Sequence, residues 1–324
     1  MKRLYLLFVV SVALFLPETV FANENANDSI DAQIELALKY IDGDSVAKDE
    51  QKGISILENL AKQGNAKAQF KIGTCFHSGK GVIKNLSQAV SWYYKAAEQG
   101  FADAQYNLGL CYLNGEGIVK NQYKAVCWFE KAVKQGHLAS IFSLGYCHYY
   151  GSGVEQDYKK AIKFFTIAAD KGSLEAQCSL GSCYANCDGV KQDLKKAVYW
   201  WEKAAEQGSE IAQYNLITYY DSVGNTAECV KWLIPLAYKG YSSAQADLGL
   251  LYYLGSGVTQ NYEVSLYFAN KSAEKGNAKG QYLLGIHYYT GAGVKKDVQK
   301  ARFWLKKAAD QGFEDAKSLL LQCY

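Results

Sequence analysis

Residues 104–136 read AQYNLGLCYLNGEGIVKNQYKAVCWFEKAVKQG, and this stretch decides the fold of the chain. Its opening pattern, Ala-x-x-x-Leu-Gly, returns in the same or a related form along the 324 residues. The copies begin at Ala32, Ala68, Ala104, Ser140, Ala176, Ala212, Ala244, Gly280 and Ala316. Successive copies are 36 residues apart, except that 32 residues separate Ala212 from Ala244. A fixed period of about 20 to 50 residues is typical of solenoids, which stack one structural unit many times.

Each repeat predicts an antiparallel pair of helices. In the quoted copy, Leu108, Gly109 and Tyr112 fall on one face of a first helix. Gly115 and Gly117 then end that helix, because glycine adopts the backbone angles of a tight turn without strain. One helix pair is too small to bury its own apolar face, so neighbouring pairs are expected to stack.

The second helix of each repeat begins and ends at capping residues. Its apolar positions in the quoted copy are Ala125, Trp128, Phe129, Ala132 and Val133. Asp or Asn precedes the helix as a candidate N-cap, whose side-chain oxygen accepts hydrogen bonds from free backbone N–H groups. These residues are Asp49, Asn85, Asn121, Asp157, Asp193, Asn261 and Asp297. A glycine follows the helix, as is usual just past a helix end. These glycines are Gly64, Gly100, Gly136, Gly172, Gly208, Gly240, Gly276 and Gly312.

The repeat resembles the Sel-like repeat, a relative of the tetratricopeptide repeat. The shared pattern is A-x-Y-N-L-G-x-x-Y-x-x-G-x-G-V, then Asp or Asn, then K-A-V-x-W-[FY]-x-K-A-A-x-Q-G. The resemblance implies an all-α fold over residues 32–324, a right-handed α-solenoid of stacked antiparallel helix pairs. Eight repeats start at 32, 68, 104, 140, 176, 212, 244 and 280, and a terminal helix occupies 316–324. For function the resemblance implies only a binding scaffold, because such repeats serve many unrelated processes.

Residues 1–22 have the pattern of a secretory signal peptide. Two basic residues precede an uncharged apolar run over 4–16, and Val20-Phe21-Ala22 places small residues before a cleavage site. We expect cleavage after Ala22 and a periplasmic or secreted protein. The apolar run is shorter than the roughly 20 residues of a membrane span, so we expect no membrane span. Residues 23–31 are polar, and we expect them to form a short disordered segment.

The charge of the chain does not point to nucleic acid. Without Lys2, Arg3 and Glu18 of the leader, it has 33 basic and 31 acidic residues. A net charge near +2, spread over the repeats, gives no basic patch of the kind that nucleic acid requires. We expect a protein or peptide partner, no nucleic acid, and a monomeric chain.

The repeat from Ala212 to Ser243 departs most from the pattern. It lacks four residues and the Gly-x-Gly-Val loop, and Pro235 lies in its second helix, where the missing N–H group favours a kink. Two interpretations stay open: drift that a modular solenoid tolerates, or a change of curvature that divides the groove between residues 32–211 and 243–324. The first repeat, with Ala37 in place of glycine, and the lone last helix are interpreted as caps.

Nine cysteines would favour disulfides in an oxidising compartment. Five of them, however, lie seven residues after the start of a repeat: Cys75, Cys111, Cys147, Cys183 and Cys323. Equivalent residues of neighbouring repeats should be about 8–10 Å apart, beyond the roughly 7 Å reach of a disulfide. We therefore predict five reduced thiols, buried as small hydrophobic groups. Cys187 is the one local partner within reach of Cys183, and whether the two are bridged stays open. The chain lacks the paired cysteines of the family's cysteine-rich branch.

No pattern nominates an active site. The four histidines, His77, His137, His148 and His287, are not spaced with other ligands so as to converge on a metal ion. The Gly-x-Gly turns are not phosphate-binding turns between a strand and a helix, and we find no set of nucleophile, base and orienting residue. We predict no catalytic residue, no metal and no cofactor.

In tetratricopeptide-like solenoids the first helix of each repeat lines the concave face. Its groove positions lie two, six, nine and ten residues after the repeat start. The residues predicted to bind a partner there are Leu113, Phe142, Tyr146, Tyr149, Tyr150, Tyr214, Tyr253 and Tyr289. The same positions also hold Phe70, His77, Tyr106, Leu110, Asn114 and Tyr282. Tyrosine is enriched at interfaces because it combines a large contact area with a polar tip. For Tyr106, Tyr214 and Tyr282, packing between repeats is an equal alternative.

The sequence thus favours a non-catalytic adaptor, in the bacterial envelope or secreted, that holds a protein or peptide in its groove and serves regulation or host interaction. Two alternatives stay open. One is an enzyme that acts on cell-wall or β-lactam compounds, as suggested for the cysteine-rich relatives. The other is a protein that binds peptidoglycan or another glycan through stacked tyrosines. The sequence does not name the partner.

Overall fold

The structure, a computed structural model, describes residues 18–323, with side chains from residue 29 onward. Seventeen helices form within these residues, which contain no strand, and this confirms the predicted all-α solenoid. The internal contacts divide the chain into two units, one ending at Gln156 and the other beginning at Asp157. The division therefore falls inside the fourth repeat, between its first and second helices, and not at the short repeat.

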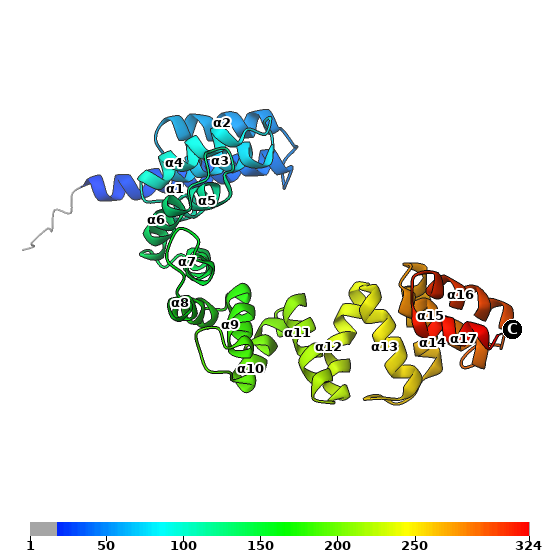
Figure 1. Ribbon diagram of the computed structural model, residues 1–324. Coiled ribbons are helices and arrows are strands. Elements are labelled where there is room, and N and C mark those ends of the chain that lie inside the picture. The colour runs from blue at the N-terminus through cyan, green and yellow to red at the C-terminus, as the bar shows by residue number, and fades with distance from the viewer. Residues whose placement is uncertain (1–17, 324) are drawn as a thin grey trace, which may run out of the picture. The chain divides into compact units, whose positions relative to one another are not determined.

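The first unit holds three helix pairs and the first helix of a fourth (Figure 1). Its helices are α1 (Glu18–Asp42), α2 (Glu50–Lys62), α3 (Ala66–Ser78), α4 (Leu86–Glu98), α5 (Ala102–Asn114), α6 (Gln122–Val133) and α7 (Leu138–Tyr150). Each helix packs against the next one along the chain. Odd-numbered helices are the first helices of their repeats, and even-numbered helices are the second.

The second unit begins with the second helix of the fourth repeat. Its helices are α8 (Tyr158–Asp170), α9 (Leu174–Asn186), α10 (Leu194–Glu206), α11 (Glu210–Ser222), α12 (Thr226–Lys239), α13 (Ser242–Leu254), α14 (Tyr262–Glu274), α15 (Ala278–Thr290), α16 (Val298–Asp310) and α17 (Glu314–Leu321). Here too each helix packs against the next. Pro235 lies inside α12, and the helix continues beyond it to Lys239. None of the helices between residues 18 and 323 has the length and apolar character needed to cross a bilayer.

The capping residues act as the sequence predicts. Each of the seven predicted Asp and Asn caps accepts a hydrogen bond from the backbone N–H three residues further on. Asn121, for example, accepts from the Lys124 N–H at 3.0 Å. In the short repeat, Asn225 accepts from the Glu228 N–H at 3.4 Å. The caps satisfy donors at the helix start that have no partner inside the helix.

Two glycines of each regular repeat allow close approach of neighbouring helices. A Cβ atom on Gly109 would lie 2.5 Å from Cε1 of Phe129, which is fully buried in the facing helix of the same repeat. A Cβ on Gly117 would lie 2.4 Å from the backbone carbonyl of Leu86, in the preceding repeat. Gly109 therefore allows α5 and α6 to pack closely, and Gly117 allows the loop after α5 to contact the start of α4 in the preceding repeat.

The segment 23–31, for which the sequence predicts disorder, is helical in the structure. Residues 23–31 lie within α1, which continues back to Glu18. The later part of this helix is anchored by Ile34, Ala37 and Ile41, all buried. A helix nucleated there extends toward the N-terminus by one hydrogen bond per residue, and no glycine or proline in 23–31 stops it. Most of the predicted leader, residues 1–17, lies outside the described residues.

Candidate partner-binding surface

The predicted groove residues lie on the first helices of their repeats, and none of them is buried. Tyr150 is 58% exposed, Tyr146 is 42% exposed and Tyr214 is 37% exposed. The other five are half-buried: Leu113, Phe142, Tyr149, Tyr253 and Tyr289. On α5, the residues that the sequence assigns to the packing face, Leu108, Gly109 and Tyr112, are buried. The helical register is therefore confirmed, and binding by these residues stays a prediction.

Four of these rings form a continuous row along α7. The ring centroids of Phe142 and Tyr146 are 6.5 Å apart, and those of Tyr146 and Tyr150 are 4.4 Å apart. Tyr149 meets Tyr150 edge-on at 4.8 Å. Residues four apart in a helix lie one above the other, so the row follows from the spacing 142, 146 and 150. Such an exposed aromatic surface is unusual on one helix face and marks a candidate contact surface.

Tyrosines two residues after the repeat start pack between repeats. Tyr106 packs against His137 with ring centroids 5.1 Å apart, and Tyr282 packs against Phe313 with centroids 5.0 Å apart. Tyr214 meets Tyr241 at 6.3 Å, nearly perpendicular. In each case the partner is the residue just before the next first helix. These tyrosines support the stacking of repeats while keeping part of their surface exposed.

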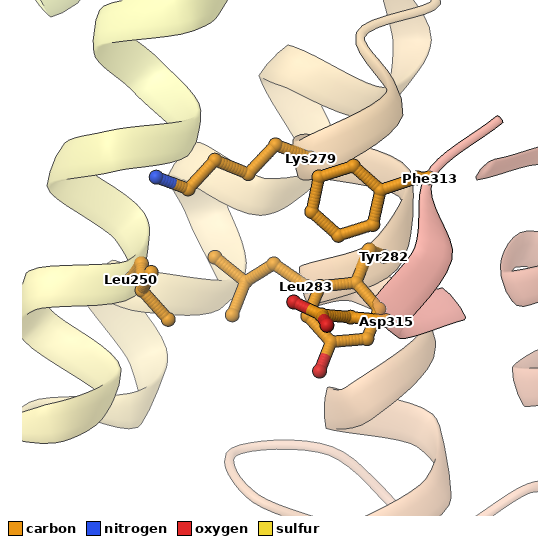
Figure 2. Close-up of a pocket in the computed structure, with 6 residues that line it drawn as sticks. All are labelled: Leu250, Lys279, Tyr282, Leu283, Phe313 and Asp315. Atoms are coloured by element: carbon orange, nitrogen blue, oxygen red, sulfur yellow. The ribbon is translucent and has the colours of Figure 1, made fainter. Parts of the chain in front are cut away.

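A pocket of about 300 Å³ opens in the second unit beside one of these stacked pairs. Its lining residues are Leu250, Lys279, Tyr282, Leu283, Phe313 and Asp315. They come from α13, α15 and the segment that begins α17. Figure 2 shows the two rings and Asp315 on one side of the pocket, with the Lys279 side chain directed away from Asp315.

The two charged groups of this pocket differ in their partners. The Lys279 Nζ forms an ion pair with the Asp247 carboxylate at 2.5 Å. No Lys, Arg or His between residues 29 and 323 forms an ion pair with Asp315. Burial, followed by the nearby Asp315 charge, raises the pKa of the Tyr282 phenol. The pocket therefore combines aromatic faces with a carboxylate that has no ion-pair partner among the described residues.

A second pocket, of about 280 Å³, lies between α3 and α5 of the first unit. It is lined by His77, Tyr93, Asn107, Leu110, Cys111, Asn114 and Glu116. The Glu116 carboxylate lies 3.1 Å from His77 Nε2 and accepts a 3.1 Å hydrogen bond from the Asn114 amide. These two contacts, that of His77 first, lower the pKa of Glu116. His77, Leu110 and Asn114, which occupy predicted groove positions, thus line a common pocket.

Sequence reasoning missed a ladder of buried glutamines that ties the repeats together. Gln105 donates to the Ala97 carbonyl of the preceding repeat at 3.1 Å and accepts from Gln135 at 2.9 Å. The same pair of bonds recurs at Gln69 and Gln177. Gln213 and Gln245 also donate to a backbone carbonyl of the preceding repeat. In these two repeats, however, a lysine stands at the end of the second helix, where the repeats of Gln69, Gln105 and Gln177 have the donor glutamine. The side-chain oxygens of Gln213 and Gln245 have no hydrogen-bond partner among the described residues. The glutamine that recurs one residue after the repeat start could have indicated this ladder in the sequence.

The structure brings together two serine–histidine pairs. In the first, His137 Nδ1 lies 2.8 Å from the hydroxyl of Ser140, which is fully buried, and His137 Nε2 lies 3.1 Å from the Asp103 carboxylate. The second pair is inaccessible. The Ser265 hydroxyl lies 2.8 Å from His287 Nε2, and His287 Nδ1 lies 2.7 Å from the Ala292 carbonyl. Both side chains are fully buried. Burial lowers the pKa of His287, which favours its neutral form. A substrate does not reach this pair, so its arrangement supports packing rather than nucleophilic catalysis.

The predicted burial of the cysteines is confirmed. Burial raises the pKa of Cys75, Cys111 and Cys147 to about 11, and that of Cys183 to about 12. All nine cysteines are unpaired in the structure, and Cys187, at the end of α9, is exposed. No cluster of three or more metal-ligating side chains occurs in the part of the chain that the structure describes.

A comparison with protein families identifies the repeat. The model of the Sel1 repeat matches residues 30–65, 66–101, 102–137, 138–173, 174–209, 242–277 and 278–313. The chain belongs to the Sel1 repeat family. Sel1 repeat proteins are generally protein-interaction scaffolds. The one gap between matches, 210–241, is the segment of α11 and α12, which confirms that the short repeat departs most from the family pattern.

A solved structure has the same solenoid fold over most of this Sel1 repeat chain. A Sel1 repeat protein from Oxalobacter formigenes is 29% identical, with a TM-score of 0.62 over 95% of this chain and 90% of that one. The protective antigen c5321 of uropathogenic Escherichia coli, described as having an SLR fold, is 24% identical. It covers 92% of this chain and 81% of its own, with a TM-score of 0.37, so only the first structure supports the fold. No curated protein matches the chain.

Proposed function

We propose that this Sel1 repeat protein is a non-catalytic adaptor that holds an extended, apolar segment of a partner protein against its first helices. The observation that carries the proposal is the row of rings on α7, where Tyr146 and Tyr150 are 42% and 58% exposed and stack at 4.4 Å. Rings held by one another lose little conformational freedom on binding, which makes them effective contact residues.

The proposal includes export to the envelope or to the outside of the cell. Its support is the leader pattern of residues 1–22, with two basic residues, an apolar run and a cleavage motif. N-terminal sequencing of the protein recovered from the cell envelope or medium is expected to begin at Asn23. A mature protein that begins at Met1 would contradict export by this route.

Site-specific photo-crosslinking tests the contact surface. A p-benzoylphenylalanine residue at position 146 or 150 keeps an aromatic ring there and reacts only with what touches it. We expect both positions to capture one partner in living cells, through a peptide rich in apolar residues. Tyr94 is the matched control, because it is 47% exposed but lies on the second helix α4.

Three outcomes would contradict the proposal: equal capture from position 94, no capture from positions 146 and 150, or a product that a muramidase but not a protease shortens. The last would identify a glycan ligand, which stacked tyrosines also accommodate.

A further inference from the structure

We propose that the pocket between α13, α15 and the start of α17 is a subsite for an arginine side chain of a bound protein segment (Figure 2). The inference rests on the proposed adaptor function and adds a chemical specificity to it. It is carried by three features of the pocket, namely its aromatic wall, its single uncompensated charge and its size.

The wall of the pocket is formed by two rings. Tyr282 and Phe313 are 5.0 Å apart, with an angle of 39° between their planes, and both are half-buried. Leu250 and Leu283 add an apolar surface for the aliphatic part of a long side chain. A cation next to an aromatic face is attracted by the ring's negative face, and the attraction is stronger where water is partly excluded.

The charge of the pocket favours a cation over an anion. Lys279 is held at 2.5 Å by Asp247, so its charge is already compensated. Asp315 is exposed and forms no ion pair within residues 29–323. An anionic ligand would meet the Asp315 carboxylate without a free cation to receive it. A cationic ligand would complete the ion pair.

Arginine fits these features better than lysine. Its planar guanidinium stacks on aromatic faces and donates two parallel hydrogen bonds to one carboxylate. Lysine has a compact, strongly hydrated charge that does neither. The volume of about 300 Å³ is at the small end of ligand pockets, which suits one long side chain.

The test uses N-acetylarginine amide as the probe and the full mature protein with labelled leucine methyl groups. We expect saturable shifts of the Leu250 and Leu283 methyl signals in NMR spectra. N-acetylcitrulline amide has nearly the same shape without the charge, and we expect it to bind at least about tenfold more weakly. N-acetylglutamate amide should leave both signals unchanged.

Two variants with the same change of charge separate the pocket from its surroundings. We expect Asp315→Asn to weaken the arginine probe about tenfold. The neighbouring Glu314→Gln should not, because Glu314 lies outside the pocket lining and pairs with Lys317 at 2.7 Å. Equal binding of citrulline and arginine, binding of the glutamate probe, or an equal effect of the two variants would overturn the inference. The comparison of probes on the unchanged protein remains decisive even if a variant folds poorly.

The result is separable from that of the crosslinking experiment. Partner capture at positions 146 and 150 without arginine binding overturns the subsite alone. Arginine binding without any such capture supports the cation site and contradicts the adaptor surface on α7.

Discussion

Replacing Gly109 with alanine tests the packing that positions the first helices. The new Cβ would lie 2.5 Å from Cε1, 2.7 Å from Cδ1 and 3.1 Å from Cζ of Phe129. Phe129 is fully buried, so its ring has no free space to enter. Overpacking of this kind typically costs about 1–3 kcal/mol. The helix gains about 1 kcal/mol when alanine replaces glycine. Because the overlap involves a ring, we expect the upper end of the packing cost, about 3 kcal/mol, and therefore a net loss of about 2 kcal/mol.

Gly249→Ala is the matched control in another repeat. Its nearest contact would be the flexible end of Leu283 at 3.0 Å, followed by atoms at 3.3 Å and beyond. The helix-propensity gain of about 1 kcal/mol should therefore offset the packing cost, and stability should stay equal or rise slightly. Urea unfolding followed by circular dichroism measures both variants, and hydrogen exchange shows whether the loss is local to α5 and α6. Equal stability of the two variants would refute the close-packing account.

Three further predictions concern buried groups. Because burial lowers the pKa of His287, the unfolded chain takes up a proton first as pH falls below about 6.5, and the free energy of unfolding decreases in that range. In melting curves at several pH values, His287→Cys should reduce the pH dependence of the melting temperature, and an unchanged pH dependence would contradict the role of His287. Gln135→Ala should cost about 1–3 kcal/mol in urea unfolding, because it leaves the buried Gln105 oxygen without its donor; a neutral effect would show that water replaces the ladder. Alkylation followed by mass spectrometry should modify Cys187 in the native protein and Cys147 only in denaturant, whereas native modification of Cys147 would contradict its burial.

The period of 36 residues made most of the fold predictable from the sequence. Glycine and Asp or Asn mark the helix ends locally, so a residue such as Asn121 reveals its role without knowledge of the fold. The positions of the groove tyrosines follow from the same register, which is why none of them is buried. The length of α1 was not predictable in this way, because residues 23–31 are polar and join a helix only by extending one already anchored.

Contacts between repeats lie outside what the pattern shows. Gln105 appears as an ordinary polar residue until the Ala97 carbonyl and Gln135 are brought beside it, from positions 8 and 30 residues away. The arginine subsite depends in the same way on Asp315 meeting Tyr282 across a repeat boundary. Period and spacing define the unit, whereas the chemistry of its surface depends on which side chains neighbouring units bring together.

The claim that the aromatic row on α7 binds a partner protein is tested most directly by the affinity of the crosslinked partner for Tyr150→Ala. Tyr150 is 58% exposed, so its removal should leave the melting temperature nearly unchanged. Loss of a central aromatic contact commonly costs about 2 kcal/mol, so we expect the dissociation constant measured by titration calorimetry to rise about thirtyfold. Lys131→Ala, on the second helix α6, should change neither quantity. An unchanged affinity for Tyr150→Ala would contradict binding on this surface, and unfolding of the variant would show that the ring belongs to the core.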